Sequence, residues 1–168
     1  RVYLGQPTPR VTGAGTATLR LFDRLQIYSM VDFKGGHHTF DWDRNIRCVQ
    51  IPNCEVIVSP EKYDPRYVAE VQNGAGQVIA SQFVSRATFA KLREVSVAYE
   101  LPTGWVRRTG ANRALFTITG RNLHTWTKFT GIDPESRSSL FTVSEIISLN
   151  QAVIPPLAEL SASLRLSF

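Results

Sequence analysis

Long apolar runs, runs of basic residues and standard catalytic motifs are all missing from this sequence of 168 residues. No stretch approaches the roughly 18 unbroken apolar residues of a transmembrane helix. A β-barrel is the other structure that crosses a bilayer, because every backbone polar group in lipid must be paired within the protein. If the chain is a membrane protein, we therefore expect it to cross with strands.

The positive charge is spread along the chain. Nineteen Lys and Arg residues give a formal net charge of +5, but none of them form a run. In proteins that bind the phosphate backbone of nucleic acids, the basic residues usually form a patch or stripe. We therefore expect no nucleic-acid partner, and we place the charges in a solvated barrel lumen or on loop surfaces.

Signatures of catalysis are also missing. The chain has no G-x-S-x-G, no H-E-x-x-H, no phosphate-binding loop and no carboxylate pair with a defined role. Four carboxylates that could bind calcium lack EF-hand-like spacing: Asp41, Asp43, Asp133 and Glu135. We expect no enzyme activity and no cofactor. An extracellular β-rich enzyme would instead need a polar cleft with shifted titratable groups.

Cysteine is scarce, and its two occurrences are close together at Cys48 and Cys54. With His37 and His38 they could form a zinc site by count, but the spacing is not a standard ligand pattern. A local disulfide is favoured, since the Pro-Asn dipeptide at 52–53 suits a turn and two nearby cysteines suit an oxidising compartment.

The clearest positive signal is the stretch 157–168, which alternates apolar and polar residues. The apolar set is Ala158, Leu160, Ala162, Leu164, Leu166 and Phe168. A period of two predicts a strand with one apolar face. Membrane-crossing strands need about 9–11 residues, whereas soluble strands usually have about 5–6. The stretch fits the closing strand of an outer-membrane barrel, or the terminal strand of a soluble β-sandwich.

Four further strands follow the same pattern, and short and long connections alternate between them. We expect these strands at about 16–21, 25–33, 89–101 and 113–127. Gly120 is compatible with a bulge or bend in the fourth. The long connections cover about 43–85, expected to be irregular, and 128–156. Membrane barrels separate long outer loops from short periplasmic turns. We predict an all-β fold, an antiparallel meander of about five long strands with two long extracellular loops.

Four motifs carry a family resemblance. The run FAKLREVSVAYELP at 89–102, GRNLHTWT at 120–127, GIDPE at 131–135 and LGQPTP at 4–9 resemble signatures of SusC/RagA-type TonB-linked outer-membrane proteins. The terminal Phe168 agrees with them. The segment around the two cysteines has no family motif.

The resemblance implies that this chain is part of a longer protein. Family members carry an amino-terminal plug, a segment that contacts TonB and a barrel of twenty-two strands. The chain begins Arg-Val-Tyr, and its roughly five strands cannot close a barrel. An open sheet leaves edges that lipid does not tolerate. We expect residues 1–168 to form the carboxy-terminal wall, with the plug and earlier strands absent.

The resemblance also implies a function and partners. The intact protein would sit in the bacterial outer membrane and import oligosaccharides or peptides. It would be energised by TonB through the missing amino-terminal part, and a SusD-like surface lipoprotein would cap it. Its other partners would be the rest of the barrel and membrane lipid. The alternative is a soluble β-sandwich module that binds glycans, in which Leu160, Leu164 and Leu166 would pack against a second sheet.

Two groups of site residues follow. The resemblance implies that Phe168, with Leu166 and Leu164, forms the signal for barrel assembly. A second group consists of aromatic residues in or near the long loops: Trp42, Tyr63, Tyr67, Trp126 and Phe129. Such rings could stack on sugars or contact a lipoprotein, or they could pack within the loops or at the membrane surface.

Overall fold

The computed structural model describes residues 3–73, 80–136, 149–150 and 154–168. It divides the chain into two compact units. We call Thr12–Phe33, Ala90–Trp126 and Pro156–Phe168 the sheet unit, and Arg1–Val11, Lys34–Phe89 and Thr127–Pro155 the loop unit. Within the described ranges, no helix has both the length and the apolar character needed to cross a membrane.

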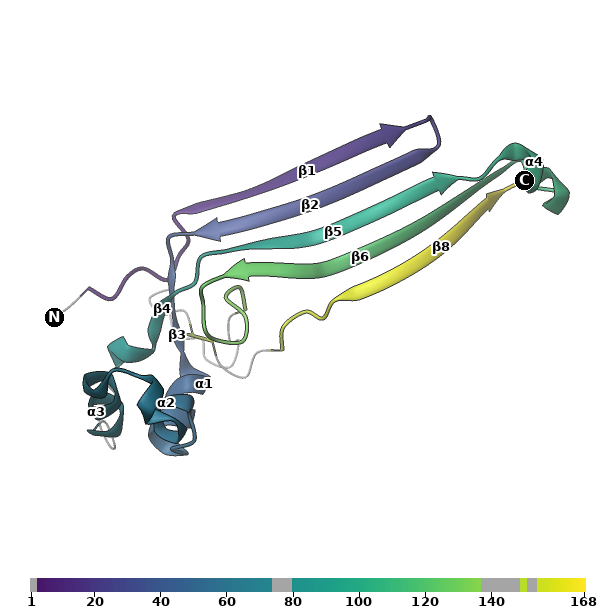
Figure 1. The fold of residues 1–168 in the computed structure, drawn as a ribbon. Helices are drawn as coiled ribbons and strands as arrows, with labels where there is room; N and C mark the ends of the chain where they lie inside the picture. The colour runs from purple at the N-terminus through teal and green to yellow at the C-terminus, as the bar shows by residue number, and fades with distance from the viewer. Residues whose placement is uncertain (1–2, 74–79, 137–148, 151–153) are drawn as a thin grey trace. The chain divides into compact units, whose positions relative to one another are not determined.

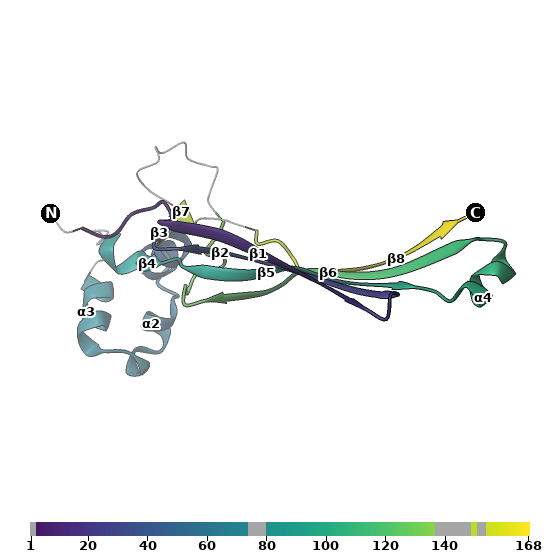
Figure 2. The same ribbon diagram turned by 90° about the horizontal axis from the view of Figure 1, so that it is seen from above.

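The sheet unit is built on five long strands whose spatial order, β1-β2-β5-β6-β8, follows the chain (Figure 1). The strands are β1 (Val11–Leu21), β2 (Leu25–Gly35), β5 (Phe89–Glu100), β6 (Arg113–Thr127) and β8 (Glu159–Ser167). At 9 to 15 residues each, all reach the length of a membrane-crossing strand. The predicted antiparallel meander is confirmed, and Figure 2 shows the twist that such sheets adopt.

The pairing of β6 with β8 sorts side chains by polarity. Ala114, Phe116, Ile118 and Gly120 lie opposite Leu166, Leu164, Ala162 and Leu160. The intervening pairs are Thr117 with Ser163, Thr119 with Ser161, and Arg121 with Glu159, and all of these residues are polar. Leu115, which lies opposite Arg165, is the apolar exception. Because successive side chains point to opposite faces, this register gives one apolar and one polar face.

The hairpin between β1 and β2 closes through Phe22 and Asp23, which have φ angles of +51° and +54°. The Arg24 N–H donates to the carbonyl of Leu21 at 3.2 Å. Two positive φ angles inside such a bond define a type I′ turn, whose twist matches the flanking strands. The sequence predicted a tight turn, but placed it one residue later, at Asp23 and Arg24.

A bulge interrupts β6 near its middle. Asn122 has a φ angle of +50°, a left-handed conformation that Asn tolerates better than most residues. A Cβ atom on Gly120 would lie 2.8 Å from the Leu123 side chain. Residues three apart point to opposite sides in a regular strand, so the approach of Leu123 to Gly120 requires an extra residue between them. The irregularity expected at Gly120 is therefore centred two residues later.

The loop unit contains helices and a small second sheet, so the expectation of an irregular 43–85 segment is wrong. The sheet has the order β4-β3-β7, with β3 antiparallel to β4 and parallel to β7. Its strands are β3 (His38–Asp41), β4 (Val84–Arg86) and β7 (Leu149–Asn150); the helices are α1 (Trp42–Asn45), α2 (Glu55–Val58) and α3 (Pro65–Asn73). A π-helical turn covers Ile46–Gln50, and 3₁₀ turns cover Pro60–Lys62 and Ala80–Phe83. The all-β prediction therefore holds for the five long strands alone.

The loop unit has its own hydrophobic core. Seven buried side chains form it: Phe40, Cys48, Cys54, Val56, Val68, Val71 and Phe83. They come from β3, α2, α3 and the turns beside them, so apolar contacts link elements that are each too short to be stable alone. Trp42, Tyr63 and Tyr67 are partly buried against this core.

The link between β5 and β6 is also ordered. It contains α4 (Thr103–Val106) and a 3₁₀ turn, Arg107–Thr109, ended by Gly110 at a φ of +80°. Val106, Ala111 and Ala114 are buried beneath it, with Leu101 packed beside them. This is a much smaller cluster than the core of the loop unit.

Candidate functional site

The apolar face of the sheet is exposed. The fractional exposures of Leu160, Leu164 and Leu166 are 77 %, 57 % and 41 %. Their partners across β6 include Phe116, which is also exposed. None of these leucines packs against a second sheet, which is the arrangement that a soluble sandwich requires.

The same face continues onto β5. Arg121 pairs with Glu94 at 3.2 Å, and Arg113 pairs with Glu100 at 3.3 Å. These two ion pairs place Glu94 and Glu100 on the polar face of the sheet. The alternate β5 positions, Val95, Val97 and Tyr99, therefore lie on the opposite face with Phe116 and Ile118.

Several residues of the recognised motifs hold strands and loops together. Arg121 and Glu94 come from different motifs and form one cross-strand pair. A neighbouring motif residue, Arg93, pairs with Asp32 of β2 at 2.8 Å. These ion pairs have a structural role, because the first joins β5 to β6 and the second joins β2 to β5.

The GIDPE motif forms a fixed turn in the loop unit. The buried Asp133 carboxylate accepts hydrogen bonds from the Glu135 N–H at 3.0 Å and the Ser136 hydroxyl at 2.9 Å. The Glu135 carboxylate then pairs with Lys34 at 3.3 Å. An aspartate that bonds its own chain two residues on is typical of an Asx turn. The turn chemistry at Asp133-Pro134 accounts for this carboxylate without a calcium ion.

Cys48 and Cys54 are joined by a disulfide, with their Cα atoms 4.9 Å apart. Cys48 lies in the π-helical turn and Cys54 immediately precedes α2, and both are buried. The disulfide therefore ties two consecutive helical segments to one another inside the core. Over the described ranges, no three His, Cys, Asp or Glu side chains are grouped to hold a metal ion.

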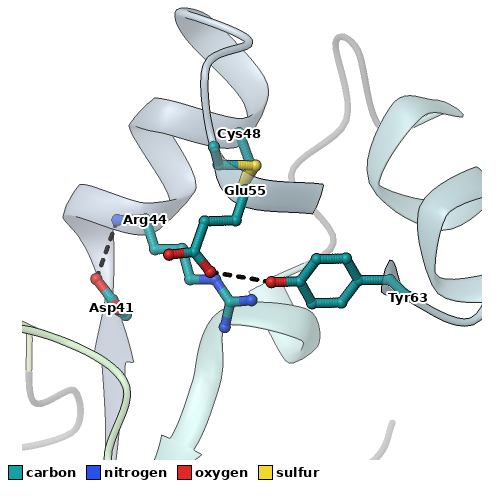
Figure 3. The surroundings of a disulfide bond; sticks show 6 residues. Asp41, Arg44, Cys48, Glu55 and Tyr63 are labelled. Carbon is teal, nitrogen blue, oxygen red and sulfur yellow. Dashed lines mark hydrogen bonds between the residues drawn. A yellow bond between two sulfur atoms is a disulfide. The ribbon is translucent and has the colours of Figure 1, made fainter. Parts of the chain in front are cut away.

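A polar pocket lies next to the disulfide, and two of its lining residues, Glu55 and Tyr63, are drawn in Figure 3. Its volume is about 340 Å³, and it is lined by Arg47, Asn53, Glu55, Val58, Ser59, Lys62 and Tyr63. Three of these residues are sequence neighbours of the two cysteines. The pocket can donate and accept hydrogen bonds, but it holds no nucleophile activated by a base, so its chemistry suits binding.

Tyr63 is held in place at this pocket by Glu55. The Tyr63 hydroxyl donates to the Glu55 carboxylate at 2.9 Å, and Arg44 lies beside the pair (Figure 3). The hydrogen bond to Glu55, together with burial and the negative charge of Glu55, raises the pKa of the Tyr63 phenol. Tyr63 is therefore a neutral donor over the physiological range.

Asp41 caps the amino-terminal end of α1. Its carboxylate accepts from the Arg44 N–H at 3.0 Å. Burial raises the pKa of Asp41 above its ordinary value of 3.8, although the Arg44 N–H and nearby arginines act in the opposite direction. A Cβ atom on Gly131 would lie 3.1 Å from the Asp41 carboxylate, so the backbone of the GIDPE motif passes close to this cap.

The five aromatic residues singled out from the sequence do not form one site. Tyr63 and Tyr67 form a pair with ring centroids 6.2 Å apart, and Trp42 packs on Phe40 at 5.6 Å. Trp126 contacts His124 at 4.7 Å on β6 and is exposed. Phe129 is only 7 % exposed, so its ring is not presented to a ligand. The sequence reasoning missed the pocket residues Arg47, Asn53 and Glu55, whose one signal was their position beside the cysteines.

Comparison of the sequence with known proteins gives a partial match. No family model matches the chain. Over 58 residues it is 33 % identical to the TonB-dependent receptor P3 of Formosa agariphila. The match covers 34 % of this chain and 6 % of that receptor.

Comparison of the structures covers almost the whole chain. The fold is similar to part of the RagAB peptide importer in its open-open state, with a TM-score of 0.72 at 19 % identity. The closed-closed state gives a TM-score of 0.70 at the same identity. Both likenesses cover 96 % of this chain and 17 % of the other chain. The chain therefore has the fold of about a sixth of that importer chain, and the resemblance to SusC/RagA-type proteins is confirmed for the fold.

Proposed function

We propose that this chain forms part of the wall of an outer-membrane active transporter that imports peptides or oligosaccharides, with energy supplied through TonB. The observation that carries the proposal is the exposed apolar face formed by Leu160, Leu164, Leu166 and their partners on β6. A sheet with one apolar and one polar face meets lipid on one side and a solvated lumen on the other. The proposed location is the bacterial outer membrane.

The fold likeness favours peptides as the cargo class, because the matched structures are of a peptide importer. The chain spans 17 % of the matched importer chain, so cargo choice in the intact protein rests mostly on residues outside it. Oligosaccharides remain the second cargo class of the proposal. The energy source, TonB, would act through an amino-terminal part that precedes this segment.

The proposed neighbours of the sheet are further strands of the same barrel. In the described sheet, β1 and β8 each have a strand on one side only. Unpaired backbone N–H and C=O groups along a strand edge are not tolerated in lipid. Pairing of β1 and β8 with the rest of a barrel would remove both edges. The two open edges therefore support the proposal that residues 1–168 are the carboxy-terminal segment of a longer protein.

The loop unit is the proposed contact surface for cargo or for a SusD-like surface lipoprotein. One long connection joins the end of β2 to the start of β5, and the other joins the end of β6 to the start of β8. Both leave the sheet at the end away from the β1–β2 turn, and the long connections of barrels are extracellular. The Tyr63–Tyr67 pair and the polar pocket beside Glu55 provide an aromatic surface and hydrogen-bonding groups. Such combinations suit peptide backbones and sugar hydroxyls alike.

The soluble glycan-binding sandwich is disfavoured. It requires Leu160, Leu164 and Leu166 to pack inside the chain, and all three are exposed. The proposal includes no enzyme activity, and the matched structures are of a peptide importer.

The function is tested by deleting the gene for the intact protein in its native bacterium and restoring it on a plasmid. Uptake of fluorescent peptides and of labelled oligosaccharides is measured with and without a protonophore. We expect uptake of one cargo class to be lost on deletion, restored by the plasmid and abolished by the protonophore. A protein found in the soluble fraction, or uptake of both classes unchanged by deletion, would contradict the proposal.

A further inference from the structure

Positive charge is concentrated at one end of the sheet unit. The β1–β2 hairpin, the β5–β6 link and the end of β8 lie together there (Figure 1), and we call residues 20–25, 100–113 and 165–168 the turn rim. The rim carries six arginines and two side-chain carboxylates: Arg20, Arg24, Arg107, Arg108, Arg113, Arg165, Asp23 and Glu100. The rest of the sheet unit carries three basic residues and three carboxylates. The whole positive excess of this unit is therefore at the rim.

Ion pairing inside the chain does not neutralise this excess. Away from the rim, Arg93 pairs with Asp32 and Arg121 pairs with Glu94. At the rim, Arg113 pairs with Glu100, which leaves Asp23 as the remaining side-chain carboxylate. Two carboxylates cannot compensate six guanidinium groups, so the rim presents net positive charge to its surroundings.

Exposed aromatic rings accompany the charge. Phe22, Trp105 and Phe168 are 90 %, 69 % and 81 % exposed. Phe22 also has a positive φ, which is unusual for a bulky residue. A large apolar ring held outward in an unfavourable backbone conformation indicates a contact outside the chain.

We propose that the turn rim binds the headgroups of an anionic glycerophospholipid in the membrane leaflet at this end of the sheet. The proposal rests on the membrane location proposed above. Arg24, Arg107 and Arg108 lie in the connections beyond the ends of the long strands, and all three are exposed. A guanidinium fork binds two phosphate oxygens at once, and all three of these connection residues are arginine. Phe22 and Trp105 fit the boundary between acyl chains and headgroups.

The neighbouring apolar face identifies the occupant as a lipid. Leu166 belongs to the exposed apolar face and ends beside Phe168 at the rim. A ligand for this surface must offer apolar chains next to the sheet and a negative group next to the arginines. A free phosphate or a nucleic acid supplies only the negative group, whereas an anionic phospholipid supplies both.

The test uses the intact parent protein, purified in detergent and inserted into nanodiscs that contain phosphatidylglycerol and phosphatidylcholine in equal amounts. Native mass spectrometry of the released protein measures the ratio of the two bound lipids. The rim variant is Arg24→Gln/Arg107→Gln/Arg108→Gln. Its matched control is Arg47→Gln/Lys62→Gln/Arg66→Gln, which removes three exposed positive charges from the loop unit.

We expect the parent and the control to prefer phosphatidylglycerol. In the rim variant, the ratio of bound phosphatidylglycerol to bound phosphatidylcholine should fall by at least about tenfold. Each basic residue near an anionic surface changes the binding affinity roughly fivefold. The Arg24→Lys/Arg107→Lys/Arg108→Lys variant keeps the charge and is expected to retain an intermediate preference. Equal loss in the control, no loss in the rim variant, or displacement of the lipid by millimolar inorganic phosphate would overturn the inference.

Failure of the two proposals can be told apart. If the parent inserts into nanodiscs as a heat-modifiable barrel but shows no lipid preference, the rim inference alone is wrong. If the parent does not insert into a bilayer, the proposed function is wrong and the rim inference is overturned with it. Insertion of the rim variant at parental yield serves as the folding check.

Discussion

The two units of this chain place their apolar residues in opposite ways. The loop unit buries seven of them in one core, including the two cysteines of the disulfide and Val56, which is fully buried. The sheet unit has one small buried cluster beneath the β5–β6 link, and its large apolar side chains on β6 and β8 are exposed. Both units are built from similar residue types, so composition does not account for the difference.

The comparison teaches where the stability of each unit comes from. The loop unit has an interior, so burial and the disulfide stabilise it from within. In the proposed barrel, the exposed face and unpaired edges of the sheet unit gain stability when lipid and neighbouring strands cover them. Substitutions in the two units should therefore respond to different surroundings.

The largest expected effect is a charge on the apolar face. Leu164→Arg in the intact barrel should lower the free energy of unfolding by about 2–4 kcal/mol, because a charged side chain at a lipid-facing position near mid-membrane loses its hydration. Folding into lipid bilayers at increasing urea concentration measures this change.

The matched control is Ser163→Arg, one residue away on the polar face opposite Thr117. It should change stability by less than about 0.5 kcal/mol, as is usual for a solvated surface. If both variants lowered the free energy of unfolding equally, the two faces of the sheet would meet the same environment. The sheet unit would then not depend on a lipid-covered face, and this contrast with the loop unit would be lost.

The next largest effect is expected from the disulfide. Cys48→Ser/Cys54→Ser should destabilise the loop unit by about 2 kcal/mol, because it removes a constraint that closes a loop with a sequence separation of 6. Limited proteolysis should cleave near 43–62 faster in the variant, while the heat-modifiable gel shift of the barrel stays at its parental temperature. A lower temperature for the gel shift of the barrel would mean that unfolding of the loop unit also destabilises the sheet unit. Reducing the parent with dithiothreitol provides an independent comparison.

A smaller effect is expected at Asp41. Asp41→Ala removes the cap of α1 and should cost about 1 kcal/mol, whereas Asp41→Asn retains a good capping side chain. Burial raises the pKa of Asp41, so its contribution is fully present below its ordinary value of 3.8 and is lost as the pH rises through the folded value. The parent should therefore lose stability relative to Asp41→Asn as the pH increases over that window. Amide hydrogen exchange of the loop unit measures both effects, and a constant difference would contradict the role of burial.

The smallest effect on stability is expected from deletion of Phe168. This residue is 81 % exposed beyond the end of β8, so barrels that assemble should melt almost normally. Their amount in the outer membrane should fall if the terminal aromatic is part of the assembly signal. Quantitative blotting of membrane fractions and thermal melting separate the two effects. Unchanged surface levels would leave Phe168 as an ordinary terminal side chain.

The strands of the sheet unit could be predicted because their signal is local and repetitive. Along 159–167, each residue type agrees with the face that the β6–β8 pairing gives it, so a period of two suffices to find both strand and face. The motif at 89–102 likewise gave β5 within one residue at its end. Ion pairs such as Arg121 with Glu94 were beyond reach, since pairing between strands does not follow from either strand alone.

The loop unit could not be predicted in the same way. α1 and α2 have four residues each, too few for a helical period to appear in the sequence. Their positions depend on packing in a core that includes Val71 and Phe83, which lie further along the chain. The pocket depends on the same packing, so only Tyr63 and the cysteines that border it were visible beforehand. The left-handed Phe22 contradicts ordinary turn preferences and could not have been anticipated.

The strict two-residue alternation of β6 and β8 limits how the gene can change length. Inserting one codon into 159–167 would turn every following side chain of β8 to the opposite face. An insertion ahead of Arg165 would place its side chain on the apolar face in place of Leu166. Inserting two codons would keep the faces and only shift the strand along its partner. Insertions in 43–85 face no such rule, because helices and turns there are fixed by packing. Among related genes, length differences should therefore come in even steps within these strands and in any step within the loop unit, except where a new bulge like the one at Asn122 absorbs a single residue.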